Sequence, residues 1–82
     1  MVYVVTREGI YRHEVLLITT NQKQAIDVAE TAAEMERQAD QEDYTETLDK
    51  PYHDFVMWTA EVGTSMTDLQ NPRIVVNGRR KG

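Results

Sequence analysis

The stretch HEVLLITTNQKQAIDVAE, residues 13–30, changes its hydrophobic period partway along, and this change decides the fold. Up to Thr19 the run of β-branched residues and leucines is typical of a strand, whereas the residues after Asn21 recur at helical spacing. The junction is a helix start, because Thr19 with Gln22 and Asn21 with Gln24 both have the spacing of a capping box. The sequence leaves these two starts as open alternatives.

The residues before this stretch predict a partner strand. VYVVT, residues 2–6, is rich in β-branched and aromatic residues, and the turn that follows contains Gly9. The connection to the second strand, residues 11–19, is too short for a crossover, so the two strands form an antiparallel hairpin. Strict alternation would place these residues on one face of the second strand: Tyr11, His13, Val15, Leu17 and Thr19. The other face would then hold Arg12, Glu14, Leu16 and Ile18.

The residues after the stretch predict an alanine-rich helix that runs to about Asp40. Small residues would let this helix lie close against a sheet along a stripe of Ile26, Ala29 and Ala33, flanked by Ala25 and Ala32. Pro51 excludes helix beyond Lys50. Because no glycine lies between Thr20 and Lys50, a helix that continues to Leu48 is equally allowed.

The last part of the chain predicts a third strand over residues 55–62 and a possible short fourth strand over residues 73–77, RIVVN. In the third strand one face would carry Val56, Trp58, Ala60 and Val62, and the other Phe55, Met57, Thr59 and Glu61. Residues 64–72 are predicted to form a loop. Residues 79–82 are predicted to be a basic frayed tail that follows a single domain of residues 1–78.

These elements predict an α+β two-layer sandwich. An antiparallel sheet of three to four strands, in the order β-β-α-β with a possible closing strand, is covered on one face by one long helix. The opposite face of the sheet stays partly open, and such faces often mediate oligomerisation or partner binding.

The composition limits the location of the protein and the classes of partner that it can bind. The chain has 82 residues, no cysteine and a net charge of −5, and it contains no stretch of about 18 apolar residues that would span a membrane. We expect a cytoplasmic protein with no membrane partner. We also expect no direct contact with nucleic acid, because an acidic protein lacks the cations that neutralise phosphates.

The charges are unevenly distributed along the chain. Residues 30–54 contain nine acids against Arg37 and Lys50, a net charge of −7, whereas the last ten residues hold four basic residues and no acid. The middle of the chain is therefore acidic and its end is basic.

Residues for catalysis are scarce, and we expect no enzyme and no cofactor. The only histidines are His13 and His53, the only serine is Ser65, and no glycine-rich phosphate-binding loop occurs. A metal site would have to use Asp49, His53 and Asp54, but the alternating pattern and the glycine of a calcium loop are missing, so none is predicted.

The strand VYVVT, the glycine turn, HEVLLITT and the helix NQKQAIDVAE together resemble the start of short phage and bacterial proteins of unknown function. The β-β-α-β layout is similar to that of small phage proteins that bind host enzymes, including one that inhibits bacterial RNA polymerase. The resemblance covers residues 2–35 and the strand at 55–62. It implies an origin in a phage or a mobile element, and it identifies no functional residues.

The acidic segment is the strongest candidate for a function. A helix extended through this segment would place carboxylates on one ridge by i+3 and i+4 spacing, and such a ridge can imitate phosphates in the basic groove of a nucleic-acid-processing enzyme. We therefore expect a protein-binding module that modulates or inhibits a host protein through this segment or through the open sheet face. The expected partner-binding residues are Glu36, Asp40, Glu42, Asp43, Tyr44, Glu46, Leu48 and Asp49. The alternative is a homodimer formed through the sheet around Trp58, Phe55 and Met57.

Overall fold

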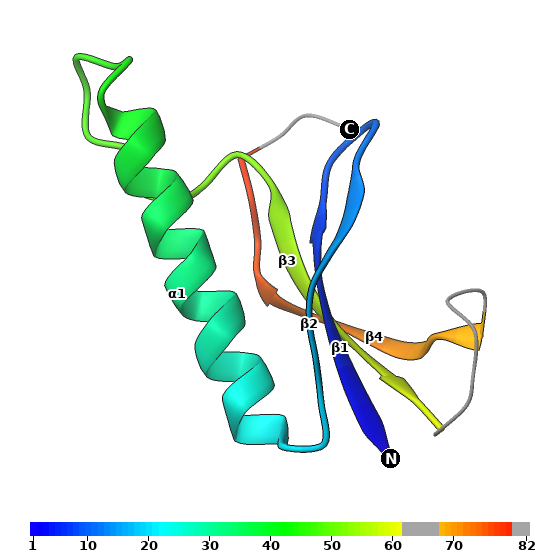
Figure 1. Ribbon diagram of the computed structural model, residues 1–82. Helices are drawn as coiled ribbons and strands as arrows, with labels where there is room; N and C mark the ends of the chain where they lie inside the picture. The colour runs from blue at the N-terminus through cyan, green and yellow to red at the C-terminus, as the bar shows by residue number, and fades with distance from the viewer. Residues whose placement is uncertain (62–67, 80–82) are drawn as a thin grey trace.

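The computed structural model describes residues 1–61 and 68–79 and confirms the two-layer α+β fold (Figure 1). The elements follow one another as β1 (Val2–Glu8), β2 (His13–Thr19), α1 (Gln22–Gln41), β3 (Asp54–Ala60) and β4 (Gln70–Val76). The fourth strand that the sequence left open is therefore present, and α1 covers one face of the sheet.

All neighbouring strands of the sheet are antiparallel, and their order is β2-β1-β3-β4. Since β2 and β3 both pair with β1, they run parallel to each other on either side of it. The segment from β2 to β3 must therefore cross over β1, and a long helix provides the length that such a crossover needs.

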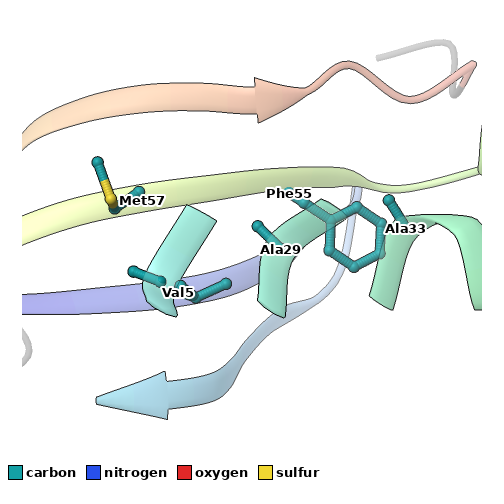
Figure 2. Close-up of a cluster of buried hydrophobic side chains, with 6 residues drawn as sticks. Val5, Ala29, Ala33, Phe55 and Met57 are labelled. Atoms are coloured by element: carbon teal, nitrogen blue, oxygen red, sulfur yellow. The ribbon is translucent and has the colours of Figure 1, made fainter. Parts of the chain in front are cut away.

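The core lies between α1 and the sheet. Ala25, Ala29 and Ala33 of α1 are buried against Val5 and the side chains of β3. Figure 2 shows Ala29 and Ala33 beside Val5 and Phe55. Their small side chains allow the helix backbone to approach the sheet closely. The predicted stripe is confirmed in its alanines, while Ile26 and Ala32 are only partly buried at its two sides.

Phe55 is the largest side chain that is fully buried, and with Met57 it fills the space under the helix. Complete burial of a side chain of this size contributes about 1.5–3 kcal/mol to the free energy of folding. Alternation along β3 agrees with the prediction between Phe55 and Ala60, because Trp58 lies on the opposite face and donates from Nε1 to Thr6 Oγ1 at 2.9 Å. The predicted end of this strand, Val62, lies outside the described residues.

Both ends of α1 are set by local hydrogen bonds. Asn21 is the N-cap, and its Oδ1 accepts from the backbone N–H of Gln24 at 3.1 Å, so the second of the two predicted starts is the one adopted. Thr19 supports it by donating to Gln24 Oε1 at 2.6 Å. The helix ends at Gln41, and the longer alternative that reached Leu48 is therefore wrong.

The predicted alternation along β2 is wrong beyond Val15. Val5 pairs with Leu17 and Thr6 pairs with Val15, which leaves Leu16 as an extra residue in a β-bulge. The bulge shifts the pleat by one residue. Ile18 therefore joins Val15 on the open face, and Leu16 and Leu17 both pack toward the core.

The fourth strand begins earlier than predicted. Gln70, Asn71 and Pro72 were assigned to a loop, but they form the first part of β4. Proline is tolerated here because β4 is an edge strand, where a missing N–H breaks no ladder on the outer side. The residues of the predicted loop from 64 to 67 lie outside the described part of the chain.

The open face of the sheet differs from the one expected for a homodimer. Phe55 and Met57 lie under α1 and are buried, so of the three residues predicted for a dimer surface only Trp58 is on the open face. The exposed apolar side chains on this face are instead Val15, Ile18 and Ile74.

Candidate functional site

Residues 42–53 join α1 to β3 without regular secondary structure, and we call them the acidic loop. Figure 1 shows this loop, in green, continuing beyond the end of α1 before it turns back toward β3. It carries four exposed carboxylates, which belong to Glu42, Asp43, Glu46 and Asp49.

The last turns of α1 hold the acidic loop by its backbone. The side chain of Gln41 donates from Nε2 to the carbonyl oxygen of Glu46 at 2.6 Å, and its Oε1 accepts from the N–H of Leu48 at 2.6 Å. Arg37 donates to the carbonyl oxygen of Leu48 at 3.1 Å. Gln41 thus replaces two backbone partners that a helix or strand would have supplied.

Arg79 holds the second half of the acidic loop. Its guanidinium donates to the carbonyl oxygen of Lys50 and to Asp40 Oδ2, both at 2.9 Å, and its backbone N–H donates to Pro51 O at 2.8 Å. The guanidinium carbon lies 5.4 Å from the ring centroid of Tyr44 and 5.7 Å from that of Tyr52. Burial disfavours the charge of Arg79, but the bonds to Asp40 and Tyr44 outweigh this effect and raise its pKa above the ordinary value.

The prediction that the frayed tail begins at Arg79 is therefore wrong for this residue, while residues 80–82 lie outside the described part of the chain. The preceding residue shows why the chain can approach so closely. A Cβ on Gly78 would lie 2.4 Å from the backbone carbonyl carbon of His53, and the N–H of Gly78 donates to Asp54 Oδ1 at 2.7 Å.

A second anchor lies where the acidic loop enters β3. The Glu36 carboxylate accepts from the backbone N–H of His53 at 3.0 Å and contacts His53 Nδ1 at 2.7 Å. Arg7 Nε lies 3.4 Å from the same carboxylate, and Arg7 also pairs with Glu14 at 3.1 Å. The His53 ring lies against Gly9 of the hairpin, where an added Cβ would be 2.7 Å from Cδ2. This network ties helix, hairpin and loop together.

The structure divides the residues predicted to bind a partner into two groups. Glu36 and Asp40 are engaged inside the molecule, by His53 and Arg79, and Leu48 is half-buried. Glu42, Asp43, Tyr44, Glu46 and Asp49 are exposed in the acidic loop. Because α1 ends at Gln41, these carboxylates lie along an irregular loop and not along a helical ridge.

The electrostatic environment of the exposed carboxylates is uneven. Within residues 1–61 and 68–79, no ion pair engages Glu42, Asp43 or Glu46. Asp49 attracts Arg37 and helps raise its pKa, although the main cause of that rise is the hydrogen bond from Arg37 to Glu34. The negative charge of the acidic loop is therefore least compensated at Glu42, Asp43 and Glu46.

The residues that position the loop were not found from the sequence. Arg37, Gln41 and Arg79 belong to residue types that are ordinarily exposed, and no local pattern distinguishes them from their neighbours. The one available signal was the opposite charge of the acidic middle and the basic end, which the pair Arg79–Asp40 brings together.

Among the described residues, the side chains around the acidic loop form no cluster of metal-ligating groups. In the described part of the chain, no three carboxylate or imidazole groups gather closely enough to hold a metal ion. Asp49, His53 and Asp54 do not converge into such a group, and His53 Nδ1 is taken by Glu36. Ser65 lies outside the described residues.

No helix among the described residues is long and apolar enough to cross a bilayer. Comparison of the chain with protein-family models, with curated proteins and with solved structures gives no match.

Proposed function

We propose that this protein is a small non-enzymatic binding module that docks its acidic loop onto a basic surface of another protein. The observation that carries the proposal is that the backbone of the acidic loop is held in place while its carboxylates stay exposed. Gln41, Arg37 and Arg79 hold its backbone from inside, while Glu42, Asp43 and Glu46 extend into solvent. A loop held in this way loses little conformational entropy when it binds.

The exposed side chains indicate the chemistry of the partner. Three to four carboxylates attract a surface rich in lysine and arginine and speed the first encounter with it. Tyr44 is 51% exposed among these carboxylates and supplies an aromatic anchor of the kind that dominates binding energy in interfaces. The groove of a nucleic-acid-processing enzyme has this character, and with the resemblance to phage proteins we propose such an enzyme of the host, in the host cytoplasm, as the partner.

A charge-matched pair of variants tests the proposal. In the loop variant, Glu42→Gln, Asp43→Asn and Glu46→Gln remove three charges. In the control variant, Asp27→Asn, Glu30→Gln and Glu61→Gln remove the same number of charges from exposed positions elsewhere. Partners captured from a bacterial lysate by the wild type would be identified and purified, and their affinities for all three proteins measured at two salt concentrations.

We expect the loop variant to lose at least tenfold in affinity and the control variant to lose less than threefold. Binding should weaken as salt rises, since exposed charges are screened. Polyanions such as heparin should compete with the wild type for the partner. Equal binding by the loop variant and the wild type would overturn the proposal.

A further inference from the structure

The two edges of the sheet are protected very differently against pairing with another strand. The β4 edge contains Pro72, which has no N–H to donate, and Asn71 with a φ of 52°. Its register to β3 also shifts at two places. Such features are the usual means by which proteins block an edge strand. The β2 edge has no proline and no lysine, and its register to β1 shifts only once, at Leu16.

A shallow apolar groove of about 500 Å³ runs along one flank of α1, and we call it the flank groove. Its apolar lining consists of Val28, Ala32 and Met35, and Met35 is 66% exposed. Val28 and Arg37 are nine residues apart and therefore lie on opposite sides of the helix. Arg37 contacts Leu48 in the acidic loop, which leads to β3. The flank groove therefore lies on the β2 side of α1. In Figure 2, α1 lies in front of the two central strands, β1 and β3, with β4 above them and β2 below them in the view.

We propose that the β2 edge pairs with β2 of a second copy of this chain, which produces a symmetric dimer with one continuous eight-stranded sheet. This interface is separate from the acidic loop and goes beyond the proposed function. A two-fold axis between the paired strands makes them antiparallel, and it places the two flank grooves opposite each other above the junction.

In this arrangement, the side chains of β2 in one copy are complementary to those of β2 in the other copy. A register that pairs Val15 with Ile18 of the second copy brings open-face residues together, and the same register pairs Glu14 with Thr19 on the helix face. The bulge at Leu16 makes this match possible, because it changes the alternation between the two halves of the strand. Without it, Val15 and Ile18 would lie on opposite faces.

Charge does not oppose the approach of a second copy at this edge. Glu14 is the only acid of β2, and it is paired with Arg7 at 3.1 Å and with Arg12 at 3.7 Å. The acidic loop is held on the opposite flank of α1, so the two loops stay far apart.

The interface is small, near the lower limit of stable interfaces at about 1,200 Å² of total buried area, so we expect a dissociation constant in the micromolar range. Sedimentation equilibrium over a concentration series should show a mass that rises toward twice the 9.5 kDa of one chain. Hydrogen exchange should slow at the amides of β2 as the protein concentration rises, and should stay unchanged at those of β4.

Two matched variants identify the edge. Ile18 and Ile74 are both exposed isoleucines on the open face, but they lie on β2 and on β4 respectively. Ile18→Lys should raise the dissociation constant at least tenfold, and Ile74→Lys should change it less than twofold. Circular dichroism would verify that both variants fold.

Three results would overturn the proposal. The first is a wild-type protein that stays monomeric up to about 1 mM. The second is equal weakening by the two variants, which indicates stacking of the open faces. The third is a concentration-independent exchange of the β2 amides, which requires no variant at all.

Discussion

The helix–sheet core and the acidic loop are both ordered, but different forces hold them. In the core, Met57 and the alanines of α1 are held by apolar packing, and Phe55 adds a contact between its ring and the Arg7 guanidinium, whose carbon lies 5.5 Å from the ring centroid. In the acidic loop, the polar side chains of Gln41, Arg37 and Arg79 bind backbone groups that regular structure would otherwise have paired.

This difference has consequences for which side chains are available at the surface. Apolar packing is insensitive to the exact direction of contact, so the core tolerates changes of similar volume but has no surface to offer. A loop held by a few directional bonds keeps its outer side chains free for a partner, as Glu42 and Asp43 are. Each contact in the loop should therefore affect local order more than global stability.

Truncation of the largest core side chain should have the greatest effect. Phe55→Ala removes the fully buried ring under α1, and we expect a loss of about 3–5 kcal/mol in the free energy of unfolding. A domain of this size has little more than that to lose, so the variant should be largely unfolded in urea titrations at low denaturant. Tyr11→Ala, at a fully exposed aromatic residue, is the control and should change stability by less than about 0.5 kcal/mol.

A methyl group at Gly78 should have the next largest effect, because it disturbs the contact between the end of the chain and the acidic loop. The new Cβ would lie 2.4 Å from the His53 backbone, which cannot rotate away as a side chain can. We expect Gly78→Ala to cost about 1–3 kcal/mol and to weaken the bonds of Arg79 to the loop. Thermal unfolding and exchange of the Arg79 amide measure both effects. An unchanged melting temperature would contradict this account, and Asn77→Ala is the neighbouring exposed control.

Removal of the Gln41 side chain should loosen the loop and leave the core intact. Gln41→Ala deletes both bonds at 2.6 Å, and since each contributes about 1 kcal/mol, we expect faster exchange at Leu48 with a nearly unchanged melting temperature. Gln38→Ala, one turn earlier on the same helix, removes a contact to Glu34 only and should leave the loop amides unaffected. A global loss of stability in the Gln41 variant would show that loop and core unfold together.

The smallest effect should come from pH. The hydrogen bond from Arg37 lowers the pKa of Glu34 below its ordinary value of 4.5. Because the folded-state pKa is the lower one, the pair stabilises the fold above pH 4.5, and this contribution disappears as the pH falls through the lowered pKa. In an NMR titration, Glu34 should titrate at a pH below its ordinary value of 4.5. The exposed pair adds little stability, and Arg37→Lys should move the titration of Glu34 back toward its ordinary value, whereas an unchanged titration would contradict the role of this hydrogen bond.

Features with a local cause could be predicted from the sequence, whereas features that depend on distant segments could not. The start of α1 was narrowed to two positions because capping needs only Asn21 and Gln24, three residues apart. The alternation of Phe55 and Trp58 was predictable because β3 is regular and central in the sheet. The bulge at Leu16 could not be predicted, since it is defined only by the register against β1.

The sequence by itself determined the order of the elements, the alanine stripe of α1 and the acidic character of the segment that follows it, because these depend on residue types and on spacings of a few positions. Tertiary structure alone decided that Glu36 and Asp40 are used inside the molecule and that Arg79 is an anchor. Their partners lie 17 and 39 residues away along the chain. Directional bonds over such separations exist only once the sheet and the helix have brought those segments together.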